Sequence, residues 1–222
     1  MKKLFLIAFT GIFAIAFTAC QSSQTTESNL NQNNSVMSMN EMNHNSVAED
    51  LKSMKNRKGS MKKSSPDAAT APYDLQFLDT MIEHHKSAVD MAKHIVAKPN
   101  NKELKEFAAK IIAEQNKEIA QMKKWREKWF TAKPLAMNME IPGMMDSMEG
   151  MNMKKMEAPG GNLLDLRFLD MMIRHHQGAI RMSKEALERA EHTEIKTLAN
   201  QIIKSQEAEI TQMQEWKRDL SR

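Results

Sequence analysis

Thiols and aromatic side chains are scarce in this chain. Only one of its 222 residues is cysteine and 5% are aromatic, whereas methionine alone fills 21 positions. The formal net charge of +4 comes with Lys and Glu interleaved along the predicted helical segments, which is typical of a solvated helix face. Because no basic stripe carries aromatic residues, the sequence does not favour a nucleic-acid partner.

The single cysteine, Cys20, ends a segment that has the features of an export signal. Lys2 and Lys3 precede an apolar run, and small residues come before Cys20. A cysteine in this place looks like a bacterial lipoprotein acceptor, so we predict a lipoprotein-type signal over residues 1–20 and a lipid on Cys20 that holds the chain at a membrane. An uncleaved anchor is the alternative, although the run is short for a span of about 20 residues. Both readings place the folded part in the cell envelope, facing the periplasm or on the outer surface.

Residues 21–72 are rich in Asn, Ser, Lys and Met and contain few aliphatic side chains. Such a segment cannot bury enough apolar surface to offset the entropy of the chain. We predict a flexible tether.

From residue 73 the pattern becomes helical. Apolar residues recur at spacings of three and four, which predicts an amphipathic helix with a wide buried face, and Asp74 is its expected N-cap. Pro99 interrupts the pattern, and a second helix follows. Residues 73–130 therefore predict an antiparallel helical hairpin.

The hairpin is duplicated. Residues 74–125 align with residues 165–216 at a constant offset of 91, and 23 of the 52 positions are identical. Residues 164–222 thus predict a second hairpin. One hairpin cannot bury its wide apolar face alone, but two can bury theirs against each other. We predict an all-α fold in which residues 73–222 form a four-helix bundle.

Residues 131–163 are punctuated by Pro and Gly and predict a long loop between the hairpins. Loops of this length are usually functional or disordered. We expect its methionines to have no core of their own to fill and to offer exchangeable thioether ligands, and we expect the fold to survive removal of residues 137–156. A promiscuous peptide-binding surface is the competing explanation. The eight methionines are Met137, Met139, Met144, Met145, Met148, Met151, Met153 and Met156.

The repeated sequences "MIEHHKSAVDM" and "MIRHHQGAIRM" each keep a His-His pair on or beside an apolar face. A lone buried histidine is usually satisfied by a carbonyl or a carboxylate. A pair has four ring nitrogens to satisfy, and each buried polar group without a partner costs about 1–3 kcal/mol. A bound metal would give some of these nitrogens a partner. The four histidines are His84, His85, His175 and His176.

Methionines lie within helical reach of these imidazoles. Met81 precedes His84 by three residues and His85 by four, which are the spacings that bring helical side chains together. Thioether and imidazole together suit soft ions, above all copper(I), although core packing explains helical methionines about equally well. The candidate ligands on the helices are Met81, Met91, Met122, Met172, Met182 and Met213.

These hairpins resemble the domain-of-unknown-function 305 family. The resemblance rests on "FLDTMIEHHKSAVDMA" and "LANQIIKSQEAEITQMQEW" and covers about residues 73–130 and 164–220. It implies a ferritin-like four-helix bundle and, as in some exported members, copper binding and copper resistance. The His-His-x-x-Ala-x-x-Met core of the family matches at His84, His85, Ala88 and Met91, and again at His175, His176, Ala179 and Met182.

Three functions remain open. The first is a non-catalytic envelope lipoprotein that holds copper(I), or silver(I), for sequestration or for transfer to another copper carrier. The second is a ferritin-like di-iron or di-manganese oxidase. Such bundles need Glu-x-x-His motifs, whereas Met81 and Met172 occupy those places before His84 and His175. The third is a helical interaction protein whose methionines only pack.

Overall fold

The structure, a computed structural model, describes residues 63–97, 101–148 and 161–222. These residues form a short 3-10 helix η1 (Ala68–Thr70) and five α-helices, and no strand occurs within the described ranges, so the predicted all-α class is confirmed. No helix in this part of the chain is both long and apolar enough to cross a membrane. The predicted signal, nearly all of the predicted tether, and Met151, Met153 and Met156 lie outside the described residues. The helices are α2 (Tyr73–Ala97), α3 (Lys102–Phe130), α4 (Met144–Met148), α6 (Asn162–Arg189) and α7 (Thr193–Leu220).

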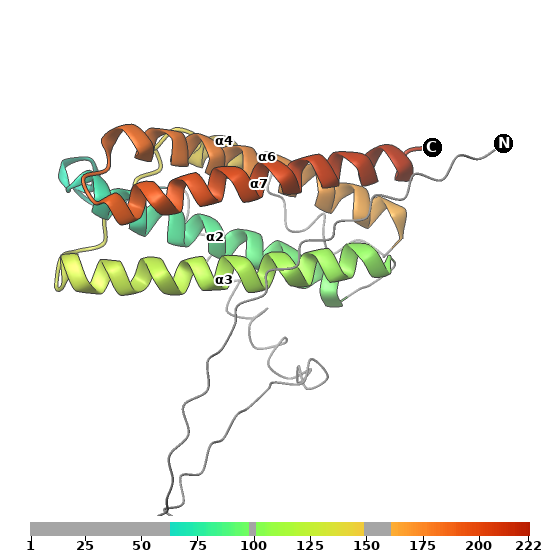
Figure 1. Cartoon of the computed structure of the whole chain (residues 1–222), viewed down its shortest axis with the longest axis horizontal. Coiled ribbons are helices and arrows are strands. Elements are labelled where there is room, and N and C mark those ends of the chain that lie inside the picture. The colour runs from blue at the N-terminus through green and yellow to red at the C-terminus, as the bar shows by residue number, and fades with distance from the viewer. Residues whose placement is uncertain (1–62, 98–100, 149–160) are drawn as a thin grey trace, which may run out of the picture. The chain divides into compact units, whose positions relative to one another are not determined.

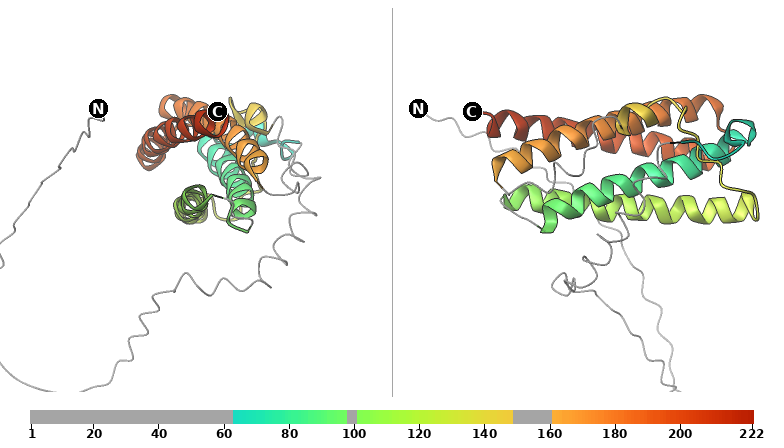
Figure 2. Two further views of the ribbon diagram at one scale, coloured as in Figure 1. Left: turned by 90° about the vertical axis from the view of Figure 1, so that its right-hand side faces the viewer. Right: turned by 180° about the vertical axis from the view of Figure 1, so that it is seen from behind.

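The four long helices form two hairpins that pack through their first members. α2 packs along α3, α6 packs along α7, and the hairpins join where α2 contacts α6. Figure 2 shows the same arrangement along the helices and from behind. α3 and α7 have far fewer backbone contacts with each other. Between the two hairpins, the packing is therefore closest at the α2–α6 seam and looser on the side where α3 faces α7.

Helix starts are fixed by polar side chains, although not all as the sequence predicts. Asn101 caps α3, and its side chain accepts a hydrogen bond from the Leu104 amide at 3.1 Å. Asp74, the expected N-cap, instead lies inside the first turn of α2. Its carboxylate accepts hydrogen bonds from the amides of Glu191 and His192, at 3.0 and 2.9 Å. The N-cap prediction is wrong because this carboxylate ties the start of α2 to the turn between α6 and α7.

Residues 131–148 differ from the predicted exposed loop. The carboxylate of Asp79 accepts a hydrogen bond from the Ala136 amide at 2.9 Å, and the side-chain amide of Asn138 donates to Gln76 at 2.8 Å. Met137 and Met139 are each 5% exposed. The expectation that this segment has no core to fill is therefore wrong for its first half, because α2 supplies buried hydrogen-bond partners that no pattern within the segment reveals.

Helix α4 lies directly against α6 (Figure 1). The contact is backbone to backbone at two glycines. A Cβ atom on Gly178 would lie 2.6 Å from the Gly143 carbonyl oxygen and 2.5 Å from the Ser147 Cβ, and Gly143 itself has φ of +99°. Because both positions exclude a side chain, the two glycines allow α4 to pack closely and to bury Met144 completely.

We expect Met144→Ala to lower the free energy of unfolding by about 2–5 kcal/mol, since it empties a buried site. Met145 is the matched control, because it is the next residue and is 58% exposed. Met145→Ala should change stability by less than about 0.5 kcal/mol. Urea denaturation of the two variants measures both values. If both variants lost equally little free energy of unfolding, Met144 would not be a core residue and the segment would be a loop, as the sequence predicts.

Candidate metal centre

All four histidines of the duplicated pairs are buried completely in the bundle. His84 of α2 and His175 of α6 meet across the seam, with ring centroids 3.7 Å apart and an interplanar angle of 35°. Their neighbours His85 and His176 turn away from the seam, as adjacent helical residues must. The structure thus places two imidazoles at the seam and one on each outer side.

A carboxylate on the second helix of each hairpin holds the outer imidazole. His85 Nε2 lies 2.7 Å from a Glu118 oxygen, and His176 Nε2 lies 2.8 Å from a Glu209 oxygen. Because a carboxylate oxygen accepts, the ring Nε2–H donates in both pairs. In the neutral tautomer that this hydrogen bond selects, Nδ1 is the nitrogen with the lone pair, and neither Nδ1 has a hydrogen-bond partner among the described residues.

The seam imidazoles are held unequally. Ser87 Oγ donates to the His84 carbonyl at 2.6 Å, and His175 Nε2 lies 2.7 Å from that hydroxyl and 3.0 Å from the same carbonyl. A carbonyl can only accept, so His175 donates from Nε2. At the offset of 91, Gly178 occupies the place of Ser87. Consistent with this difference, neither nitrogen of His84 has a partner within the described part of the chain.

The seam imidazoles are neutral at pH 7. Burial lowers the pKa of His84 well below its ordinary value, and the neighbouring rings of His175, His85 and His176 lower it further. Burial likewise lowers the pKa of His175, although its hydrogen bond to the His84 backbone opposes that effect. A neutral imidazole keeps a lone pair for a cation, so these nitrogens can bind metal without first losing a proton.

Two carboxylates near His176, those of Glu209 and Glu114, have pKa values that are shifted in opposite directions. Burial raises the pKa of Glu209, but the hydrogen bond from His176 and the nearby charges outweigh it and hold the pKa below the ordinary value. The pKa of Glu114 is raised, by burial and by a hydrogen bond with Glu209. Glu209 is therefore the charged acceptor of this cluster. It resembles the carboxylates that orient metal-binding histidines elsewhere.

The helical methionines separate into two groups that the sequence did not reveal. Within one hairpin, Met81 and Met91 lie in different core clusters. Each group draws one methionine from each of three helices, and the groups are equivalent at the offset of 91. All six side chains are fully buried. The first group is Met81, Met122 and Met182, and the second group is Met172, Met213 and Met91.

The methionines of the connecting segment distribute differently. Met137, Met139 and Met144 join the core cluster that contains the first methionine group. This cluster therefore contains more methionines than the cluster of the second group. Met148 is half-buried beside this cluster, and Met145 is exposed. Buried thioethers do not serve as freely exchangeable surface ligands, which corrects the expectation for the first three.

Carboxylates do not dominate the centre. Among the described residues, no three His, Cys, Asp or Glu side chains converge as a metal centre would require. The buried candidate donors are imidazoles and thioethers, and Glu118 and Glu209 are hydrogen-bond partners of two of the imidazoles. This donor set fits a soft ion and lacks the bridging carboxylates of a di-iron site.

The sequence does not predict a role for Ser87, because that role depends on α6. It also predicts no role for two buried glutamines, one on the second helix of each hairpin. Gln115 and Gln206 are equivalent at the offset of 91 and are 3% and 2% exposed. Both amide atoms of Gln115 and the amide oxygen of Gln206 have no partner within the described ranges. The sequence feature that could have indicated them is that glutamine occupies both positions at the offset of 91.

The chain matches one family model and several solved structures. The family model for the "Domain of unknown function (DUF305)" matches residues 16–126 and 74–217. A search of curated proteins found no match. The chain is similar to CopM in the Cu(I)-bound form, with 33% identity, coverage of 66% of this chain and 96% of that chain, and a TM-score of 0.56. It is similar to CopM co-crystallised with Ag, with 34% identity, the same coverage and a TM-score of 0.51. A DUF305 protein from Streptomyces coelicolor, described as a putative secreted protein, is 26% identical over 68% of this chain and 94% of that chain, with a TM-score of 0.58.

The buried imidazoles make stability sensitive to acid. The lowered pKa values of His84 and His175 mean that the unfolded chain takes up protons below about pH 6.5 that the folded chain does not. Stability is therefore retained above that pH and lost below it, by about 1 kcal/mol per pH unit for each imidazole. Urea denaturation of the metal-free protein between pH 7 and pH 5 measures the slope.

The double variant His84→Gln with His175→Gln should flatten this profile. His94→Gln is the control, because His94 is only half-buried, and it should leave the slope as in the parent chain. An unchanged slope in the double variant would assign the acid sensitivity to other groups.

Proposed function

Because the chain belongs to the DUF305 family, we propose that it is a non-catalytic protein that binds copper(I), and silver(I) by the same chemistry. The observation that carries this proposal is that four fully buried imidazoles have ring nitrogens without a partner among the described residues, while six methionines on the four long helices are also fully buried. The similarity to CopM, which has been solved in Cu(I)-, Cu(II)- and Ag-bound forms, supports it.

The ligand chemistry favours the lower oxidation state. Copper(I) and silver(I) are soft and prefer thioether sulfur, with imidazole as a suitable partner. Glu118 and Glu209 fix Nε2 of the outer rings as donors, which leaves Nδ1 as the nitrogen available to a cation. Thioethers also do not form disulfides, so a methionine site stays intact where thiols oxidise.

The biological setting belongs to the proposal as well. A lipid on Cys20 would hold the bundle at a membrane of the cell envelope, outside the cytoplasm. There the protein would sequester copper, or transfer it to another copper carrier, and so contribute to copper resistance. The exposed Met145 and the methionines Met151, Met153 and Met156 would supply weaker thioether sites.

Changing His84, His85, His175 and His176 together to Ala should remove the tightest copper(I) sites. The imidazoles are the only nitrogen donors proposed for the centre, so we expect apparent affinity to fall on the order of tenfold or more, as loss of a ligand or of its partner does elsewhere. Competition of the full chain with a chromophoric copper(I) chelator measures the affinity. Far-ultraviolet circular dichroism verifies that the variant is folded. An unchanged affinity in a folded variant would contradict the proposal.

Replacing Met81, Met122 and Met182 with Leu tests the sulfur ligands separately. Each change conserves volume and should cost less than about 1.5 kcal/mol, so the core survives. We expect this variant to lose the tightly bound copper of the first methionine group and to keep that of the second. The equivalent triple change at Met91, Met172 and Met213 should have the reverse effect. Met145→Leu is the control and should leave the tight sites intact. If neither triple variant lost copper, the methionines would be packing residues, as in the third function considered from the sequence.

A further inference from the structure

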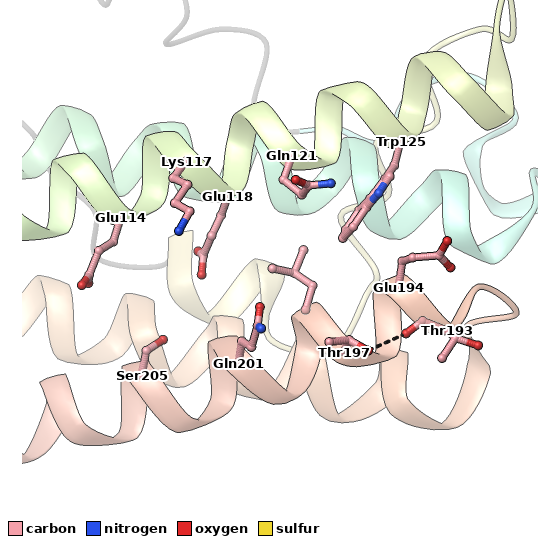
Figure 3. A pocket seen from close by; sticks show the side chains of 11 residues that line it. Glu114, Lys117, Glu118, Gln121, Trp125, Thr193, Glu194, Thr197, Gln201 and Ser205 are labelled. Atoms are coloured by element: carbon pink, nitrogen blue, oxygen red, sulfur yellow. Dashed lines mark hydrogen bonds between the residues drawn. The ribbon is translucent and has the colours of Figure 1, made fainter. Parts of the chain in front are cut away.

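The loose side of the bundle carries a groove of about 940 Å³ between α3 and α7. Figure 3 shows side chains from both helices along it, with Glu118 and Gln121 on α3 facing Gln201 and Thr197 on α7. Glu118 is also the hydrogen-bond partner of His85. The groove therefore reaches the carboxylate that holds the outer imidazole His85, and that imidazole itself is fully buried.

The equivalent region of the second half is closed by an aromatic contact. There Phe107 of α3 packs edge-to-face on Trp216 of α7, with ring centroids 4.9 Å apart. At the offset of 91, these residues correspond to Leu198 and Trp125, and both line the groove. Trp125 stacks on Trp129 of its own helix at 5.5 Å. The first half thus has no aromatic pair at this level, and its aromatic contact between the two helices lies at the helix ends, where Trp129 stacks on His192, the N-cap of α7, at 3.8 Å.

In the second half, an ion pair also connects α3 to α7. Lys110 of α3 lies 4.0 Å from Glu209 of α7 and 3.7 Å from Glu114. The position equivalent to Lys110 is Gln201, which is neutral and lines the groove, whereas Glu114 itself also lines the groove. Accordingly, the side chain of Glu118 is 20% exposed, whereas that of its equivalent, Glu209, is 7% exposed.

We propose that the two halves exchange metal at different rates: the α3–α7 groove admits a soft cation to the His85 side of the bundle, and the equivalent His176 side is sealed. This inference rests on the proposed function. It adds the route by which copper(I) enters and states which half exchanges it faster. The first half would take up and release copper(I) rapidly, and the second would retain it.

The groove lining favours a cation. Its charged side chains are Glu114, Glu118 and Glu194 against the single Lys117, so it is negative overall. Clefts lined by one sign of charge concentrate ions of the opposite sign. Trp125 adds an aromatic face, which also attracts cations. Beyond Glu118, the first methionine group lies in the core cluster of this half, with Met122 one helical turn further along α3.

Exchanging the distinctive residues between the halves tests the proposal. The closing variant carries Leu198→Phe and Gln201→Lys, and the opening variant carries Phe107→Leu and Lys110→Gln. The full chain is loaded with copper(I), mixed rapidly with an excess of a chromophoric copper(I) chelator, and followed by stopped-flow absorbance. The parent chain should release copper in a fast and a slow phase, and only the slow phase should remain when Met81, Met122 and Met182 are changed to Leu.

We expect the closing variant to slow the fast phase on the order of tenfold and the opening variant to accelerate the slow phase similarly, with total copper unchanged. Lys102→Gln is the control for charge, because Lys102 lies on α3 with its side chain 88% exposed, and it should alter neither phase. Circular dichroism melting establishes that each variant is folded, and the two reciprocal variants must move in opposite directions.

The outcomes separate this inference from the function on which it rests. A single release phase in the parent chain, or two phases that neither exchange variant alters, would overturn the assignment of an open and a sealed half while leaving copper binding intact. Failure of the parent chain to hold copper(I) against the chelator would instead remove the proposed function.

Discussion

The structure depends on burying four imidazoles where two helical hairpins meet. At the seam between the hairpins, burial lowers the pKa values of His84 and His175, because charge is costly away from water. Three of the rings are oriented by Nε2 donation to Glu118, Glu209 or the Ser87–His84 pair. Nδ1 of all four rings has no hydrogen-bond partner among the described residues, and the proposed cation would supply one.

The buried methionines connect the cores of the two hairpins. Each half contributes a buried thioether to the core of the other, since Met182 joins Met81 and Met91 joins Met172. A side chain that fills the core and also offers sulfur to an ion makes packing and binding inseparable. Volume-conserving changes to Leu are therefore more informative than truncation, because truncation alters both properties at once.

Duplication gave this protein two similar halves, and a few substitutions made them unequal. Gly178 in place of a second Ser87 leaves His84 without the hydroxyl that holds His175, and it also allows α4 to pack against α6. Leu198 and Gln201 leave a groove where Phe107 and Lys110 close the other half. In both places a single local difference changes a hydrogen bond or a contact between helices, and the repeated scaffold remains.

The sequence by itself determined the all-α fold, the duplicated hairpins and the donor types, because helical periodicity and a constant offset of 91 are properties of the chain alone. It could not show that Met81 joins Met182 rather than Met91, that Asp74 binds a distant turn, or that Met144 is buried, because each depends on which helix lies alongside. The tertiary structure also decided which ring nitrogens are free. A tautomer is fixed by the atom that lies opposite the ring, and that atom comes from another part of the chain.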